Sequence, residues 1–192
     1  MKQECTSINK KRVPAIFKKT LKYMPRGSVN LDVGGGKFDT ATTFLDKEKG
    51  IKNLIYDPYN RSREHNRNVL NAVNFVRGAD NVTCSHVLNV IKEEEIQLEV
   101  IQLCYDGLFG YGKAFFTVYE GDKSGAGKST PRGYQRNEKL DDYLPLIKLV
   151  FPKVVKINGM LVAMKYDSDA FYAEEVPFRP LNVRKILGES RY

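Results

Sequence analysis

The sequence predicts an α/β domain with a mostly parallel β-sheet and a C-terminal β-hairpin, and three observations support this. Short apolar runs alternate with longer segments of helical periodicity along most of the chain. Three consecutive glycines, Gly34–Gly36, separate the first apolar run from a segment that can begin a helix. Towards the other end, Asn158-Gly159 joins two apolar runs, which is the strongest short-range signal for a hairpin.

Size and composition favour a single domain over residues 1–192. Hydrophobic content of 42% and charged content of 28% are typical of a soluble globular protein. No apolar run approaches the ~18–20 residues needed to cross a bilayer. Because the N-terminal residues lack the apolar core of a signal peptide, we expect a cytoplasmic protein with no membrane partner.

Charge and cysteine content narrow the choice of ligand only slightly. A net charge of +8 permits binding of DNA, RNA or an anionic substrate without demonstrating it. The three cysteines, Cys5, Cys84 and Cys104, lack the spacing of a metal site, and the last two lie in apolar runs. We therefore expect inert core thiols and no bound metal.

Residues 1–27 form a basic N-terminal region, in which 8–24 have the periodicity of an amphipathic helix. Two interpretations stay open. The helix is either a solvated element that packs on the domain, or a surface that follows phosphate groups. Its basic residues are Lys10, Lys11, Arg12, Lys18, Lys19 and Lys22.

The segment 30–39 predicts a strand, a tight turn and the start of a helix. Glycine lets a ligand approach the backbone, and the amides at the helix start then face that ligand. A helix over 39–49 is ended by Gly50, and a second strand over 53–57 ends in Asp57, 21 positions after Gly36. In this βαβ arrangement a carboxylate at the end of the second strand binds ribose hydroxyls.

Residues 32–36, Asp-Val-Gly-Gly-Gly, resemble the first motif, D-x-G-x-G, of class I S-adenosylmethionine-dependent methyltransferases. The dinucleotide fingerprint fits less well, because Asp39 stands where its last glycine belongs. The resemblance implies a Rossmann-like methyltransferase sandwich with S-adenosylmethionine as cofactor. It places Asp32 near the methionine amine, the glycine backbone under the cofactor and Asp57 on the ribose. Tyr59 is either a stacking partner for adenine or a plain loop aromatic.

After a helix over 62–77, the segment 80–91 resembles the fourth strand of the same family and the turn after it. A third strand between residues 62 and 80 is very short or missing. His86, at the strand end, is either a base or a packing residue, and packing is favoured. The turn holds Ser85-His86-Val87-Leu88 in place of Asp/Asn-Pro-Pro-Tyr/Phe, and the chain has no Pro-Cys nucleophile. The two best-known DNA-base methylation chemistries are therefore not supported.

The second half of the sequence predicts a helix over 92–108 and a strand over 114–120. Residues 122–129 come close to a P-loop, but Thr-Pro-Arg-Gly follows and would break the helix that a P-loop requires. The segment 121–137 is instead expected to be a long loop, either a substrate lid or a flexible solvated loop. A helix over 141–151, the hairpin and an irregular tail over 166–192, with a short helix at 181–187, complete the chain.

Four short segments carry a narrower resemblance. Together they are similar to a group of small methyltransferase-like proteins of phages and mobile elements, which are related to methyltransferase-like proteins associated with DNA phosphorothioation. This resemblance does not define a substrate. The segments are 57–61, 87–91, 118–122 and 134–137.

The expected function is that of an S-adenosylmethionine-dependent methyltransferase whose substrate is unknown and related to nucleic acids or nucleotides. Two alternatives stay open: a catalytically idle nucleic-acid-binding or regulatory module on the same fold, and an enzyme that consumes the cofactor by cleavage or other group transfer. Glu120 is the expected base, on its position at a strand end alone. The expected cofactor-binding residues are Asp32, Gly34, Gly35, Gly36, Asp57, Pro58, Tyr59 and Ser85. The expected catalytic residues are Glu120, His86 and Asn137, and those for substrate are Tyr119, Gln135 and Arg136.

Overall fold

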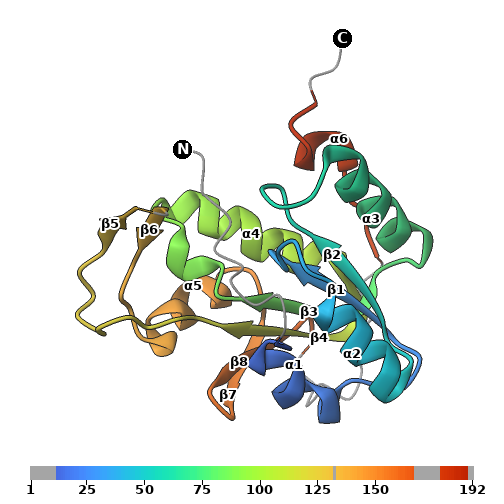
Figure 1. Ribbon diagram of the computed structural model, residues 1–192, viewed down its shortest axis with the longest axis horizontal. Helices are drawn as coiled ribbons and strands as arrows, with labels where there is room; N and C mark the ends of the chain where they lie inside the picture. Colours follow the sequence, from blue (N-terminus) through green and yellow to red (C-terminus); the bar gives the residue numbers. More distant parts are fainter. Residues whose placement is uncertain (1–11, 132, 167–177, 190–192) are drawn as a thin grey trace.

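The computed structural model describes residues 12–131, 133–166 and 178–189, and its main feature is a six-stranded sheet of order β2-β1-β3-β4-β8-β7 (Figure 1). The first four of these strands are mutually parallel, and the last two are antiparallel to their neighbours. The fold is therefore the predicted α/β arrangement with a C-terminal hairpin. The strands are β1 (Val29–Val33), β2 (Lys52–Tyr56), β3 (Ala79–Ser85), β4 (Leu108–Thr117), β7 (Lys153–Ile157) and β8 (Met160–Met164).

Helices cover both faces of this sheet (Figure 1). Phe115, in β4, packs in one core with Ile16 and Leu45. The next residue, Phe116, packs in the other core with Ile101. Successive side chains of a strand point to opposite faces, so one strand supplies both cores. On the first face lie α1 (Ala15–Thr20) and α2 (Thr40–Lys49); on the second lie α3 (Arg63–Phe75), α4 (Glu94–Gly107) and α5 (Leu144–Lys148), with α6 (Val183–Ile186) against α3.

The third strand of the family pattern is missing, as the sequence indicated. From the end of β2 the chain enters α3 directly and returns in β3, which pairs with β1. Residues 57–78 are all described, and they contain no strand. As a result β2 is an edge strand of the described sheet. The carboxyl ends of β1 and β3 lie side by side, because these two strands pair directly.

The basic N-terminal helix is shorter than predicted. Residues 1–11 lie outside the described residues, and the helix extends only over α1, followed by a 3-10 turn, η1 (Leu21–Tyr23). Pro14 is extended (φ −56°, ψ 140°) and begins the helix, because its ring fixes φ and it has no amide proton to donate. Met24 is extended again and ends the turn.

Three further features differ from the prediction. The strand expected over 114–120 is β4, which ends at Thr117, so Glu120 does not stand at a strand end. Within the expected loop 121–137, β5 (Lys128–Thr130) and β6 (Gly133–Gln135) form a small antiparallel hairpin. A strand therefore occupies the position after Gly127 where a P-loop needs a helix. The predicted helix over 141–151 is divided into η3 (Leu140–Tyr143) and α5.

Other local predictions are confirmed. Gly50 ends α2 with a left-handed backbone (φ 64°). Asn158 and Gly159 have φ values of 51° and 69°, as a two-residue hairpin turn requires. The short helix expected near the C-terminus is α6. Cys84 and Cys104 are buried free thiols.

Candidate functional site

The predicted cofactor and substrate residues lie at or beyond the carboxyl ends of β1, β2, β3 and β4, with Asp32 and Ser85 among the last two residues of β1 and β3. In an open parallel sheet this edge is where ligands bind. Two regions make up the edge. The first is the glycine turn, Gly34–Gly36, together with the turn 57–60 after β2. The second is the lid segment, residues 121–137, together with 117–120 and η2 (Leu88–Val90).

The glycine turn needs its glycines for steric reasons. Gly34 and Gly36 have φ values of 73° and 76°, a conformation that L side chains rarely adopt. A Cβ on Gly35 would lie 2.2 Å from Oδ2 of Asp32, and one on Gly34 would lie 2.4 Å from Cγ2 of Val87. The Gly34 amide donates to the carbonyl of Tyr56 at 2.7 Å, which fixes the turn to the end of β2.

The Asp32 carboxyl packs against this turn at Gly35. Its side chain is only 2% exposed, and its Oδ1 accepts a hydrogen bond of 2.8 Å from the Thr83 hydroxyl. Burial raises the pKa of Asp32 to about 7, although the Thr83 hydroxyl acts in the opposite direction. The carboxyl group is therefore held inside the fold, where it shapes the turn.

Asp57 joins the glycine turn to the turn that follows β2. Its Oδ2 accepts from the Gly36 amide (2.8 Å) and from Nδ2 of Asn60 (2.9 Å). Its Oδ1 accepts from the amides of Tyr59 (3.0 Å) and Asn60 (2.9 Å). An ionised carboxylate has about four acceptor positions, so all are used within the chain. Asn60 is partly exposed, and its side chain is the partner that an incoming hydroxyl could replace.

Two residues that sequence reasoning left without a role hold this arrangement. Arg61 donates from Nε to the carbonyl of Gly36 (2.8 Å) and forms an ion pair with Asp39 at 2.7 Å. Asn66, which is 2% exposed, pairs with the main chain of Asp57: its Oδ1 accepts from the Asp57 amide and its Nδ2 donates to the Asp57 carbonyl, each at 2.9 Å. Asn66 stands at helical spacing with the apolar residues Val69, Leu70 and Val73. A polar residue on this apolar face was the sequence signal that could have identified it.

Beside these contacts, Pro58 and Tyr59 lie at the surface, and Tyr59 is 58% exposed. No hydrogen bond of the Tyr59 ring is present in the part of the chain that the structure describes, so its face is open to a stacking ligand.

Ser85 and His86 end β3 on the other side of the glycine turn. The Ser85 hydroxyl is 2.9 Å from the hydroxyl of Thr117, and the His86 amide donates to the Thr117 carbonyl at 2.8 Å. His86 has a φ of 59°, unusual for a residue with a Cβ. Loss of hydration and the nearby ammonium of Lys19 lower its pKa, so the imidazole is neutral at pH 7.

The lid segment is attached to the domain by its predicted substrate residues. Gln135 and the 2%-exposed Asn89 are joined at 3.0 Å, while Gln135 Nε2 also donates to the Tyr119 carbonyl at 2.9 Å. The Asn89 carbonyl in turn accepts from the Arg136 amide at 2.9 Å. Gln135 thus connects β6 to η2 and to the end of β4, leaving Tyr119 itself 59% exposed.

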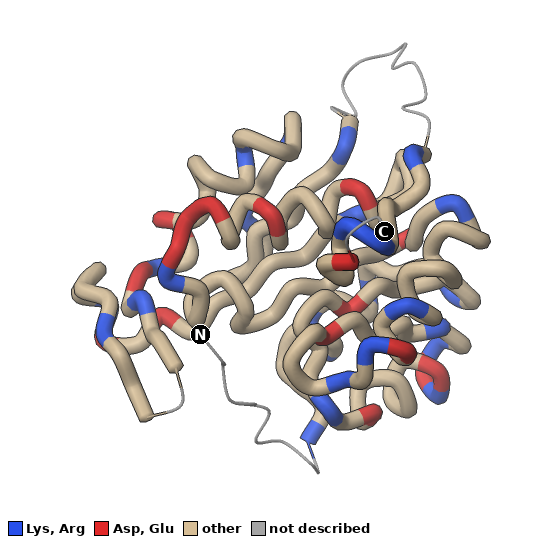
Figure 2. The backbone as a smooth tube through the Cα atoms, turned by 90° about the horizontal axis from the view of Figure 1, so that it is seen from above, with Lys and Arg blue, Asp and Glu red and all other residues tan. Residues whose placement is uncertain are grey.

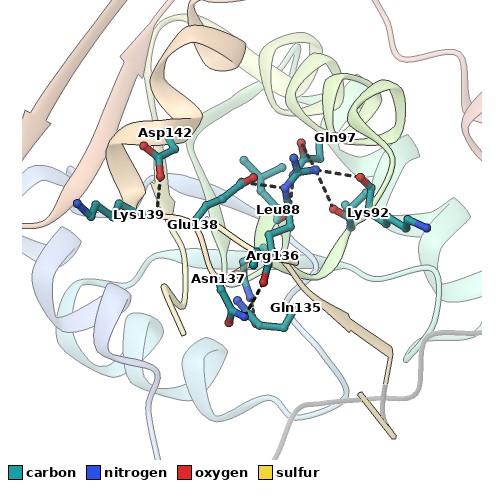
Figure 3. Close-up of polar contacts among 12 residues, drawn as sticks. Leu88, Lys92, Gln97, Gln135, Arg136, Asn137, Glu138, Lys139 and Asp142 are labelled. Carbon is teal, nitrogen blue, oxygen red and sulfur yellow. Dashed lines mark hydrogen bonds and ion pairs between the residues drawn. The ribbon is translucent and has the colours of Figure 1, made fainter. Parts of the chain in front are cut away.

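Arg136 extends this attachment to the start of α4 (Figure 3). Its guanidinium pairs with Glu138 at 2.8 Å and donates to the carbonyl of Lys92 at 2.9 Å and to Oε1 of Gln97 at 3.3 Å. Gln97 is itself held by the Leu88 carbonyl at 2.7 Å. The planar donor fork of Arg136 is therefore directed at the protein and not at open space.

Asn137 and Glu120 are also engaged in contacts within the chain. Asn137 is 2% exposed, has a φ of 57° and donates to the Ala126 carbonyl at 3.0 Å. Glu120 accepts from the Leu140 amide at 2.9 Å and pairs with Lys123 at 3.0 Å. The Leu140 amide and Lys123 both lower the pKa of Glu120, which makes its carboxylate a weaker base at neutral pH.

The described ranges contain no group of three or more His, Cys, Asp and Glu side chains arranged to hold a metal ion. They also contain no helix with the length and apolar character that crossing a membrane requires.

The sheet order, the helices on both faces and the C-terminal hairpin define a Rossmann-like methyltransferase fold. No family model matches the chain, and no curated protein matches it by sequence. Solved structures do match. The 1,6-didemethyltoxoflavin-N1-methyltransferase of Burkholderia thailandensis, solved with S-adenosylhomocysteine bound, gives a TM-score of 0.56 at 17% identity over 78% of this chain and 73% of that one.

Two other neighbours have the same fold at similar distance. An S-adenosylmethionine-dependent methyltransferase from Clostridium acetobutylicum gives a TM-score of 0.51 at 13% identity, covering 78% of this chain and 89% of that one. The pyocyanin biosynthetic protein PhzM gives 0.50 at 16% identity, and the match covers 77% of this chain but only about half, 53%, of PhzM. Identities this low establish the fold alone.

Proposed function

We propose that the chain is an S-adenosylmethionine-dependent methyltransferase that binds its cofactor on the glycine turn. The observation that carries the proposal is the hydrogen bond from the Gly36 amide to Asp57, which places a carboxylate from the end of β2 directly beside a glycine turn at the end of β1. Only a glycine backbone permits the close approach that such a cofactor requires.

The residues of this edge fit the two ends of an adenosine group. A ribose hydroxyl can replace Nδ2 of Asn60 on Oδ2 of Asp57 without disturbing the three main-chain donors. The exposed ring of Tyr59 is available to stack on adenine. Asp32 would act through the turn that it supports. When bound, the cofactor supplies a methyl group on an activated sulfonium, so the protein mainly has to orient the acceptor.

For the methyl acceptor we propose a nucleic acid or a nucleotide, because the chain carries a net charge of +8. His86 is the better candidate base at this edge, since its imidazole is neutral at pH 7 whereas Glu120 is engaged by Leu140 and Lys123. The similarity to proteins of phages and mobile elements and the cytoplasmic location stay predictions.

Equilibrium binding of S-adenosylmethionine and S-adenosylhomocysteine, measured by calorimetry, tests the cofactor site. Asp57→Ala is expected to weaken cofactor binding at least about tenfold, because the substitution removes a charged hydrogen-bond acceptor. Asp46→Ala is the matched control, because this exposed carboxylate lies on α2 and forms no hydrogen bond or ion pair with its side chain within the described residues. Absence of binding by the wild-type chain, or equal affinity of Asp57→Ala, would refute the proposal.

A second candidate is a catalytically idle nucleic-acid-binding module on the same fold. The engagement of Arg136, Asn137 and Glu120 in contacts within the chain favours it, because these side chains are then not open to a substrate. Incubation with methyl-labelled cofactor and extracts of DNA, RNA, protein and small molecules separates the two functions. Mass spectrometry of the spent cofactor identifies the third alternative, cleavage or another group transfer.

A further inference from the structure

A basic pocket lies away from the glycine turn, on the sheet face covered by α1 and α2. Its volume is about 710 Å³, and it extends from the last turn of α2 to the turn between β7 and β8. Of the described residues that line it, none is acidic. We call it the lysine pocket, lined by Lys18, Lys19, Leu21, Lys22, Lys49 and Asn158.

The four ammonium groups of the lysine pocket are not paired with acidic side chains in the part of the chain that the structure describes. Within the ranges 12–131, 133–166 and 178–189, none of them forms an ion pair. Lys49 donates to the Met24 carbonyl at 2.7 Å, and Lys22 lies 4.8 Å from the ring centre of Tyr23. Basic residues are otherwise spread around the whole backbone (Figure 2). In the lysine pocket, by contrast, four basic side chains line one cavity.

The neighbourhood of the pocket argues against a membrane as its partner. A membrane-surface helix must offer an apolar face to the lipid. Ile16, Phe17 and Met24 are at most 3% exposed and belong to the protein core, and Leu21, which lines the pocket, is partly buried against the same core. In α1 and η1 the lysines are exposed and no large apolar side chain is, so this region offers charge without an apolar face.

The chemistry of the lining favours several phosphates over one. A site for a single phosphate usually directs an arginine fork or converging main-chain amides at the anion. Here the charged groups are all lysines, which act as separate, mobile point charges on flexible stems. Such groups suit a polyanion whose phosphates are spaced along a backbone, and they bind it by releasing its counterions.

The lysine pocket reaches the edge of the sheet that holds the candidate site. Leu161, just after the β7–β8 turn, lies opposite Phe116 near the carboxyl end of β4. Lys19 Nζ is 3.6 Å from the position that a Cβ of Gly159 would occupy, and its charge also lowers the pKa of His86. A ligand held by Lys19 therefore lies close to the end of β3.

We propose that the lysine pocket binds the phosphate backbone of a nucleic acid. The binding itself does not depend on methyl transfer; that the bound nucleic acid carries the methyl acceptor rests on the proposed function. Because the pocket is built from α1, η1, α2 and the β7–β8 turn, the lid segment takes no part in it.

Fluorescence anisotropy measures the affinity of the chain for short labelled DNA and RNA, both single- and double-stranded. The measurement is made without cofactor and at a series of KCl concentrations. The variant Lys18→Gln/Lys19→Gln/Lys22→Gln is expected to lose at least about tenfold in affinity and to reduce the salt slope by up to about 3, near 0.9 per lost contact. The control removes the same charge from exposed lysines of other elements and is expected to stay within about twofold of wild type. The control variant is Lys92→Gln/Lys148→Gln/Lys185→Gln.

Four results would overturn the proposal: no binding of any nucleic acid by the wild-type chain, an equal loss in the control variant, complete competition by millimolar inorganic phosphate, or stronger, lysine-dependent binding to phosphatidylserine vesicles. Calorimetric measurement of cofactor affinity in the same triple variant distinguishes the lysine-pocket proposal from the proposed methyltransferase function. Unchanged cofactor affinity with lost nucleic-acid binding supports the pocket alone. Nucleic-acid binding by a wild-type chain that binds no cofactor refutes the proposed function and leaves the pocket standing.

Discussion

The glycine turn and the lid segment lie at the same edge of the sheet, yet they use their polar groups differently. Around the glycine turn, Asp57 is bonded mainly to amides of its own and the neighbouring turn, and one partner, the Asn60 side chain, can be replaced from solvent. In the lid segment, Arg136 donates to the Lys92 carbonyl outside the segment and Asn137 donates to the Ala126 carbonyl within it, so both side chains are used in contacts of the chain itself.

This difference shows what position at a sheet edge can and cannot indicate. Polar residues at the carboxyl ends of parallel strands are expected near a ligand. Whether they contact it depends on how much of their hydrogen-bonding capacity is left after folding. By this criterion Asp57 beside the glycine turn keeps one partner that a ligand can displace, whereas Gln135 and Arg136 use their side chains to attach the lid segment to the domain.

The largest expected contrast between the two regions is in the pH dependence of stability. Burial raises the pKa of Asp32 from its usual 3.8 to about 7, so the folded chain retains a proton that the unfolded chain releases. The resulting stabilisation is complete below the unfolded pKa and is lost as pH rises through about 7, an effect of up to about 4 kcal/mol. Urea unfolding at a series of pH values should show this fall in wild type and not in Asp32→Asn.

Glu120, in contact with the lid segment, provides the matched comparison. Because its pKa is lowered, its contribution has the opposite sign: it is present above the unfolded pKa and lost as pH falls. Glu120→Gln is expected to leave the fall between acid and neutral pH in place. Identical pH profiles for Asp32→Asn and wild type would show that Asp32 does not titrate as described.

A second contrast concerns glycines. Gly35→Ala places a methyl group against the Asp32 carboxyl, and we expect a loss of about 3 kcal/mol in the free energy of unfolding. Gly125→Ala, in the lid segment, meets no atom within 4 Å and costs only the strain of its φ of 72°, about 1 kcal/mol. Denaturant unfolding of both variants measures the difference, and equal losses would contradict the close packing under Gly35.

A third prediction concerns the hydrogen bond between Asn137 and Ala126, which joins two parts of the lid segment to each other. Asn137→Gly keeps the left-handed backbone but removes the hydrogen bond to Ala126, worth about 1–2 kcal/mol locally. Amide hydrogen exchange over 121–131 should become faster, while cofactor affinity stays the same. A large loss of cofactor affinity would instead place Asn137 in contact with the ligand.

The smallest effect is expected at the replaceable partner of Asp57. Asn60→Ala removes the side-chain donor on Oδ2 that a ribose hydroxyl would displace. Cofactor affinity should therefore change by less than about threefold, in contrast to the large loss in Asp57→Ala. Calorimetry of the two variants side by side makes the comparison, and a loss in Asn60→Ala as large as that in Asp57→Ala would show that the ribose does not take this position.

Sequence reasoning was most successful where structure follows from neighbouring residues. The glycine turn, the end of α2 at Gly50 and the Asn158-Gly159 hairpin depend on backbone conformations that few residues allow. The missing third strand could also be predicted, because one helical segment fills the interval between β2 and β3. Boundaries were less accurate: the N-terminal helix is short, and β4 ends before Glu120.

The sequence by itself therefore determined the fold class and the position of the glycine turn beside Asp57, since both rest on local patterns. Only the tertiary structure decided which polar groups keep hydrogen-bonding capacity for a ligand. Arg136 meets Lys92 and Gln97, about 40 residues earlier, and Lys49 joins Lys18 in one pocket across 31 positions. Such contacts depend on how distant elements pack, and packing leaves no periodic signal in the sequence.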